Sequence, residues 1–305
     1  MRVPGDHVLV PRWLEVTGVG KQIDFDPGSK PRDDELANVG FFVPGYLEDP
    51  NAWWAQSMPN LEVMQLLTIG FDYAIKHVPA NVTLCNAAGV HEQSTAELAI
   101  GMIISHWRGI DAAARSMTTG TWNHTRGRSL QEATAVVIGA GGVGARIAAL
   151  LEALGAHVRV VGRTARPGVT AMSDINAVLA AADVVVLAVP LTEETAGMVD
   201  RNFLARLPDG ALLVNVARGP VVNTDALLAE LATGRISAAL DVVDPEPLPS
   251  EHPLWSAPNL LITPHVGGDS DAFPRLVRRL IVEQVERWRA GKPLANVIGA
   301  PGEPR

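Results

Sequence analysis

A cluster of glycines at residues 139–144, with the sequence GAGGVG, interrupts an otherwise apolar stretch. It directly follows the strand-like run ATAVVI and leads into the helix-like stretch ARIAALLEAL. In that context the first glycine permits a tight turn, the second lets a pyrophosphate approach the backbone, and the third allows close packing of helix on strand. The spacing therefore predicts dinucleotide binding rather than an ordinary turn, with contacts from Gly139, Gly141, Gly142, Val143 and Gly144.

The end of the next strand-like run, VRVV, carries the sequence Gly162-Arg163-Thr164-Ala165-Arg166. A site for NAD usually places a carboxylate here, about twenty residues after the glycines, to bind the ribose 2'-hydroxyl. Arg163, Thr164 and Arg166 instead offer positive charge and hydrogen-bond donors to a 2'-phosphate. The pattern predicts NADP as the preferred cofactor with NAD possible, although both arginines could also be solvated loop charges.

The elements that must position these residues alternate between short β-branched runs and Ala- and Leu-rich stretches. The runs are too continuously apolar for a sheet with one solvent-exposed face. They indicate a parallel sheet with helices packed on both faces. Strands are predicted at 135–138, 157–161, 184–189, 211–216, 238–242 and 260–263. Helices are predicted between them at 143–154, 175–181 and 224–233.

The region before residue 86 has a weaker alternation, with strand-like runs at 39–43 and 63–67, and is interpreted as a smaller α/β domain. Residues 94–119 read as one long helix that Gly101 and Gly109 interrupt only weakly. A second long helix is predicted over 273–289, before Gly291 and Pro293. We interpret the two long helices as crossings between domains, after which the C-terminal tail returns to the first domain.

Composition narrows the class of protein. A formal net charge of -8 argues against a nucleic-acid partner. The apolar tracts are interrupted by charges before they reach bilayer-spanning length, so no membrane helix is expected, and no export signal is evident. Cys85 is the only cysteine, which excludes an internal disulfide and a cysteine-cluster metal site. We expect no metal and a cytoplasmic location, with Cys85 as a buried apolar side chain.

Several ordered motifs resemble those of the D-isomer-specific 2-hydroxyacid dehydrogenase family, over nearly the whole length of the chain. Besides the glycine cluster, they are AGVHEQSTAEL (88–98), AVPLTEET (188–195), VNVARGPVVN (214–223), ALDVVDPEPLPSEHPLW (239–255) and ITPHVGG (262–268). The resemblance implies two doubly wound parallel-sheet α/β domains, with a Rossmann cofactor domain inserted in a flavodoxin-like substrate domain. The expected boundaries are 1–95 plus 275–305 for the substrate domain and 96–274 for the cofactor domain. It also implies an active site between the domains and a homodimer formed through the cofactor domain.

The family's catalytic residues fall on Arg218, Glu246 and His265. Reduction of a 2-oxo acid builds negative charge on the carbonyl oxygen, so a proton donor and a fixed cation are needed there. The resemblance makes His265 the acid, Arg218 the planar cation that grips the substrate, and Glu246 the carboxylate that holds the imidazole ready. Taken singly, each could instead be an ordinary surface or loop residue.

The resemblance places further contacts around this set. The backbone amides of Ile69 and Gly70 match the loop that receives the substrate carboxylate, although the same residues could form a plain strand-to-helix turn. The remaining cofactor contacts fall on Pro190, Thr195, Ala217, Asp241 and Gly267. Asp241 could instead only cap a strand end.

Two features keep alternatives open. The run VGGDSDAF after His265 departs from the common family pattern, which puts the edge of the nicotinamide site in doubt. The pair Trp53 and Trp54 could wall the substrate pocket or belong to a core or interface.

The expected reaction is reduction of a 2-oxo acid, glyoxylate or hydroxypyruvate or a larger one, to the D-2-hydroxy acid. A rival class is a nucleotide-sensing co-repressor on the same fold. A formate-dehydrogenase-like enzyme would pair its histidine with glutamine, and Glu246 argues against that reading.

Overall fold

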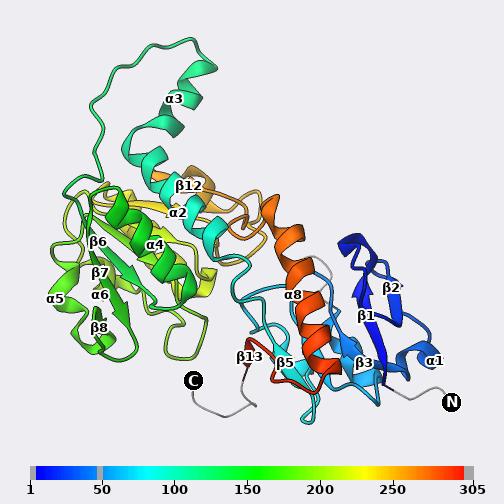
Figure 1. The fold of residues 1–305 in the computed structure, drawn as a ribbon. Coiled ribbons are helices and arrows are strands. Elements are labelled where there is room, and N and C mark those ends of the chain that lie inside the picture. Colours follow the sequence, from blue (N-terminus) through cyan, green and yellow to red (C-terminus); the bar gives the residue numbers. More distant parts are fainter. Residues whose placement is uncertain (1–4, 47–50, 299–305) are drawn as a thin grey trace. The chain divides into compact units, whose positions relative to one another are not determined.

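In the computed structural model, residues 5–46 and 51–298 are described. The chain divides into two compact units: Met1–His91 with Asp271–Arg305, and Glu92–Ser270. Each contains one predominantly parallel sheet with helices on it (Figure 1). The fold class expected from the sequence, two doubly wound α/β sheets with one unit inserted in the other along the chain, is confirmed.

The first unit has the sheet order β13-β5-β4-β3-β1-β2. Without the last strand of the chain this is the flavodoxin-like order. Its strands are β1 (His7–Pro11), β2 (Gln22–Phe25), β3 (Val39–Phe42), β4 (Val63–Gln65), β5 (Thr83–Cys85) and β13 (Val297–Ile298). The expected return of the C-terminal tail is confirmed, because β13 pairs with β5, although it does so antiparallel.

Two apolar clusters cover this sheet. On one face, Val8, Val10 and Cys85 pack with the buried side of the long helix α8 (Ala272–Arg289). On the other, Leu9 and Phe42 pack with Trp54 of the 3-10 helix η2 (Ala52–Ser57) and Leu36 of α1 (Asp33–Leu36). Adjacent residues of β1 thus enter opposite clusters, as the two-residue period of a strand requires.

The second unit has the order β12-β11-β10-β9-β6-β7-β8, all parallel, which is the Rossmann order with one further strand. Its strands are β6 (Thr134–Ile138), β7 (His157–Gly162), β8 (Val169–Ala171), β9 (Val184–Leu187), β10 (Leu212–Asn215), β11 (Ser237–Leu240) and β12 (Leu260–Ile262). Its helices are α2 (Glu92–Trp107), α3 (Ile110–Met117), α4 (Gly142–Ala153), α5 (Asn176–Leu179), α6 (Arg201–Leu204) and α7 (Thr224–Ala232). The order turns around between β6 and β9.

Alternating strand residues again supply two cores. Val137, Val186 and Val214 face α2 and α4, whereas Val136, Val185 and Leu213 face the side that carries α6 and α7. Both faces are therefore dry, which explains why these strands read as continuous apolar runs.

The prediction of one helix over 94–119 is wrong. Two helices, α2 and α3, replace it, and Gly109 stands between them at φ 65. That left-handed conformation suits glycine and cannot continue a right-handed helix, whereas Gly101 lies within α2 without breaking it. Figure 1 shows α3 and the chain after it extending away from the rest of the second unit.

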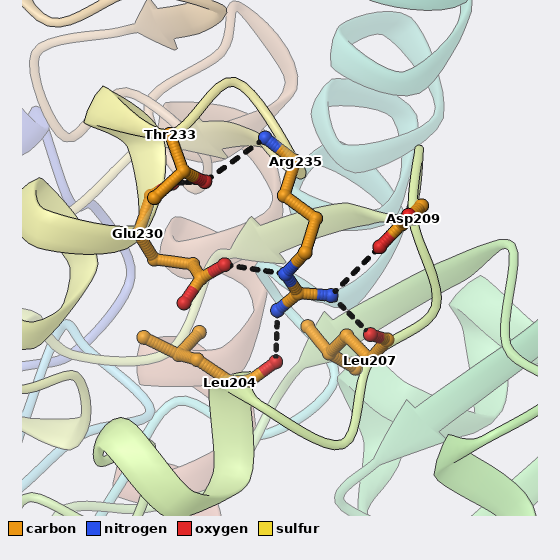
Figure 2. Close-up of polar contacts among 6 residues, drawn as sticks. All are labelled: Leu204, Leu207, Asp209, Glu230, Thr233 and Arg235. Atoms are coloured by element: carbon orange, nitrogen blue, oxygen red, sulfur yellow. Dashed lines mark hydrogen bonds and ion pairs between the residues drawn. The ribbon is translucent and has the colours of Figure 1, made fainter.

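A network of polar contacts around Arg235, which lies between α7 and β11, connects α7 with the end of α6 (Figure 2). Its guanidinium donates to Glu230 Oε1 at 2.6 Å and to the carbonyl oxygens of Leu204 (2.7 Å) and Leu207. The carboxylate of Asp209 lies 3.6 Å from the same group. The Leu204 carbonyl oxygen, at the end of α6, also accepts from the Leu207 amide at 3.1 Å, so Arg235 adds a second donor to this helix end.

Candidate active site

The glycine loop has the geometry that its spacing predicts. Gly139 stands at φ 121, and a Cβ there would lie 2.3 Å from the Ala188 carbonyl oxygen. A Cβ on Gly144 would lie 1.8 Å from the Gly139 carbonyl oxygen. Nothing lies within 4 Å of a Cβ built on Gly141, the N-cap of α4. The outer two glycines thus serve packing, and the middle one leaves open space at a helix N-terminus suited to a phosphate.

Two more loops leave the same edge of the sheet beside this one. The chain after β9 is closed by the Thr195 hydroxyl, which donates to the Pro190 carbonyl oxygen at 2.7 Å. The chain after β7 carries Arg166, which donates to the Ala140 carbonyl oxygen at 2.8 Å. These loops follow β6, β7 and β9, at the turn-around point where open α/β sheets bind ligands.

The two arginines after β7 lie in unequal surroundings. Arg163 Nε is 3.6 Å from Glu194 Oε2, with both side chains mostly exposed. The guanidinium of Arg166 donates to the loop backbone in the bond already described. Thr164 is exposed between them. A 2'-phosphate would thus meet two cations, one of which already has a neighbouring carboxylate.

His265 and Glu246 form a hydrogen-bonded pair. His265 Nδ1 donates to Glu246 Oε1, which leaves Nε2 as the ring nitrogen that can exchange a proton with a substrate. Partial burial acts to raise the pKa of Glu246, but the hydrogen bond and electrostatic attraction of His265, the backbone hydrogen bond of Val243 and the charge of Arg218 together outweigh it. The pKa of Glu246 is therefore lowered from its ordinary value of 4.5. The carboxylate stays ionised and can orient the imidazole.

Asp241 anchors the segment that carries His265. Its side chain, 3% exposed, accepts from Thr263 Oγ1 at 2.7 Å and from the amides of Val266 and Gly267, each at 2.9 Å. The His265 amide donates to the Asp241 carbonyl oxygen at 2.8 Å. These bonds hold His265 at φ 53, a left-handed conformation that side chains other than glycine adopt at a cost.

Arg218 leaves the end of β10 on a turn that Asn215 anchors. The Asn215 side chain, 1% exposed, donates to the Arg218 carbonyl oxygen at 3.0 Å and accepts from the Ala217 amide at 3.0 Å. Arg218 itself is half-buried and donates to the Ala217 carbonyl oxygen at 2.8 Å. Sequence reasoning missed Asn215, whose signal is a polar residue that ends an apolar strand.

The structure thus brings Arg218, Glu246 and His265 to the carboxyl edge of the Rossmann sheet, after β10, β11 and β12. Ile69 and Gly70 belong to the other unit, where they form a half-buried turn after β4.

The tryptophan pair of the first unit has two different environments. Trp54 is 2% exposed and packs in the core, whereas Trp53 is 52% exposed. Cys85 is fully buried, as expected.

Within 5–46 and 51–298, no group of three or more His, Cys, Asp or Glu side chains is arranged to hold a metal ion. No helix in this part of the chain is long and apolar enough to span a bilayer.

Known proteins match this chain along most of its length. Residues 100–267 match the family described as D-isomer specific 2-hydroxyacid dehydrogenase, NAD binding domain. A human glyoxylate reductase/hydroxypyruvate reductase is 30% identical over 253 residues, which cover 78% of this chain and 77% of that protein. A D-3-phosphoglycerate dehydrogenase from Archaeoglobus fulgidus is 31% identical over 257 residues, 81% of this chain but only 49% of that longer protein.

Solved structures give the same result. A D-isomer specific 2-hydroxyacid dehydrogenase from Xanthobacter autotrophicus Py2, crystallised with NADPH and MES, superposes with a TM-score of 0.83 at 29% identity, covering 98% of this chain and 99% of that one. The resemblance expected from the sequence motifs is confirmed, and so is an NAD(P)-binding domain. The chain belongs to the D-isomer specific 2-hydroxyacid dehydrogenase family.

Proposed function

We propose that this protein reduces a small 2-oxo acid to the D-2-hydroxy acid, with His265 as the proton donor. The observation that carries the proposal is the His265–Glu246 pair beside Arg218, on the edge of the sheet that also holds the glycine loop. Relatives named glyoxylate reductase/hydroxypyruvate reductase and glycerate dehydrogenase support the substrate class.

Each residue of the proposed site has a distinct role in the reaction. Bound NADPH supplies the hydride. Arg218 presents a planar cation to the substrate's carboxylate and carbonyl oxygen, where negative charge develops. His265 Nε2 delivers a proton to that oxygen, while ionised Glu246 holds the ring by Nδ1. The amides of Ile69 and Gly70 bind the substrate carboxylate, and Pro190, Ala217, Asp241 and Gly267 contact the cofactor.

The unit Glu92–Ser270 is proposed as the cofactor domain and the other unit as the substrate domain. The boundaries expected from the sequence, after residues 95 and 274, stay a prediction.

The test is the initial rate of NADPH oxidation with 2-oxo acids from glyoxylate to phenylpyruvate, with the product's configuration assigned by chiral chromatography. His265→Ala is expected to lower kcat by about 10²- to 10⁴-fold, the usual contribution of a general acid. His157→Ala, at an exposed histidine of β7, is the matched control and should keep the wild-type rate. A protein that binds NADPH but reduces no acid would favour the nucleotide-sensing role instead.

We propose NADPH as the preferred cofactor, because no carboxylate ends β7 and two arginines stand there instead. Removing both, in Arg163→Ala/Arg166→Ala, should raise the KM for NADPH by about tenfold to a hundredfold and leave that for NADH unchanged. Glu194→Gln should lower the KM for NADPH, since it removes the carboxylate beside Arg163. Arg159→Ala, at an exposed arginine of the same strand, controls for general loss of charge. Equal KM changes for both cofactors would refute the preference.

We also propose a homodimer. Three apolar side chains on α3 and the chain after it are exposed: Ile110 (53%), Met117 (82%) and Trp122 (96%). Apolar side chains that gather in one exposed segment usually mark an interface. Light scattering should give twice the chain mass for the wild type and a smaller mass for Met117→Ser/Trp122→Ser. A monomeric wild type would overturn this proposal.

A further inference from the structure

The turn that is proposed to receive the substrate carboxylate has its carbonyl groups fixed from one side. The Thr68 carbonyl oxygen accepts from the Ala87 amide at 2.9 Å. The Ile69 carbonyl oxygen accepts from Asn86 Nδ2, also at 2.9 Å. Residues 86 and 87, directly after β5, therefore hold two consecutive peptide groups of the turn.

The planarity of the peptide group carries this constraint to the amides. In a trans peptide the N–H points opposite to the C=O of the same plane. The two cis peptides recorded in the described chain both precede prolines, at Pro245 and Pro247, so the turn is trans. Since both carbonyls point toward residues 86–87, the N–H groups of Ile69 and Gly70 both point away from them. Two neighbouring amides aimed to one side suit a carboxylate with two oxygens.

Asn86 is itself held in one orientation. Its Oδ1 accepts from the Ala88 amide at 3.2 Å, so its Nδ2 must be the atom that faces Ile69. Its own carbonyl oxygen accepts from Gln65 Nε2 at 2.9 Å. Gln65 is fully buried and accepts from Gln284 of α8 at 2.9 Å. A chain of amide side chains thus connects the sheet, α8 and the turn.

Thr68 fixes the third peptide of the turn. Its hydroxyl donates to the Gly70 carbonyl oxygen at 2.6 Å and lies 3.2 Å from the Tyr73 hydroxyl. Gly70 is therefore held on both sides, by Asn86 through the peptide before it and by Thr68 through the peptide after it. Of these contacts, the one that orients a proposed carboxylate-binding amide through a side chain is that of Asn86.

We propose that Asn86 is a positioning residue that aims the Gly70 amide at the substrate carboxylate. The inference rests on the proposed function, because it assigns a role within the same site. A purely structural role for Asn86 predicts that its loss lowers stability and kcat and raises the KM of the acid and that of NADPH together. The positioning role predicts a selective loss in binding of the acid, since carboxylate binding is shared by the ground state and the transition state.

The experiment compares Asn86→Ala with the wild type for KM and kcat of the best 2-oxo acid, KM of NADPH, and melting temperature. We expect the KM of the acid to rise by about tenfold to a hundredfold, the usual effect of losing a hydrogen bond to a charged group. kcat and the KM of NADPH should stay within about twofold. The inhibition constant of oxamate, a carboxylate inhibitor, should rise in parallel with the KM of the acid.

Two further variants keep the test decisive. Asn60→Ala is the matched control, because exposed Asn60 also donates its Nδ2 to a carbonyl, that of Ala37 at 2.7 Å, and should leave all constants unchanged. Asn86→Asp keeps the volume and the acceptor for Ala88 but removes the donor to Ile69, and serves where the alanine variant fails to fold. It should raise the same KM.

The outcomes separate the two proposals. An unchanged KM for the acid in a folded Asn86 variant overturns the positioning role and leaves the proposed function intact. Equal losses for acid and NADPH also overturn it, in favour of a structural role. A wild type that reduces no 2-oxo acid defeats the proposed function itself.

Discussion

The loop after β6 and the loops after β10 and β12 leave the same edge of one sheet, yet different features fix their shapes. In the glycine loop, the absence of side chains at Gly139 and Gly144 allows close backbone contact. The buried side chain of Asn215, at the end of β10, binds the backbone of the loop after β10, and that of Asp241, directly after β11, binds the backbone of the loop after β12. A loop that wraps a phosphate needs open space and free amides, whereas a loop that carries a reacting side chain needs that side chain held in place.

The largest effect on the free energy of unfolding is expected at Gly144. A methyl group there would lie 1.8 Å from the Gly139 carbonyl oxygen, so α4 would have to move away from β6. Gly144→Ala should cost about 3 kcal/mol or more of stability, at the upper end for overpacking, and should abolish NADPH binding. Urea unfolding and cofactor titration measure both. A stable variant that binds NADPH would show that this loop is not set by close packing.

A smaller loss of stability is expected at Asp241. Asp241→Asn keeps the shape but replaces an acceptor by a donor that faces an N–H or O–H group, at a cost of about 1–3 kcal/mol. The loss of position at His265 should also lower kcat by about tenfold to a hundredfold. Urea unfolding and steady-state rates check the two parts. Asp209→Asn, at a largely exposed carboxylate of the same unit, is the control. Wild-type kcat in the Asp241 variant would contradict the anchoring role.

The stability of the fold should also depend on pH, because Glu246 has a lowered pKa in the folded protein. Ionised Glu246 stabilises the fold fully above its ordinary pKa of 4.5, and this contribution is lost as the pH falls through the lowered folded-state pKa. The difference in melting temperature between the wild type and Glu246→Gln should be constant above about pH 5.5 and shrink at lower pH. A difference that grows on acidification would mean that the pKa is raised.

The smallest effect on stability is expected at Gly141, where a Cβ meets nothing within 4 Å. Gly141→Ala should change the free energy of unfolding by less than about 1 kcal/mol, yet weaken NADPH binding because the methyl group occupies the open space. Differential scanning fluorimetry with and without NADPH separates these effects. Unchanged NADPH affinity would show that the open space is not the phosphate site.

The sequence predicted the elements of the Rossmann sheet better than those of the first unit. Its central strands, such as β9 and β10, are buried on both faces and therefore appear in the sequence as continuous apolar runs. In the first unit, β1, β2 and β5 were not predicted, and in β2 the charged Asp24 interrupts the apolar pattern. The break at Gly109 was also missed, since a glycine within a helix and one that ends it look alike in sequence.

The sequence by itself determined the order of motifs, the glycine spacing and the residue types available for chemistry. These depend on local periodicity and on Cβ sterics, which act over a few neighbouring residues. Only the tertiary structure decided that Glu246 meets His265, that Asp241 and Asn215 anchor two loops, and that Asn86 turns two amides to one side. The contacts of Glu246, Asp241 and Asn86 join residues that follow different strands, and those of Asn215 depend on the local turn after β10. A hydrogen bond depends on distance and direction, which spacing along the chain does not encode.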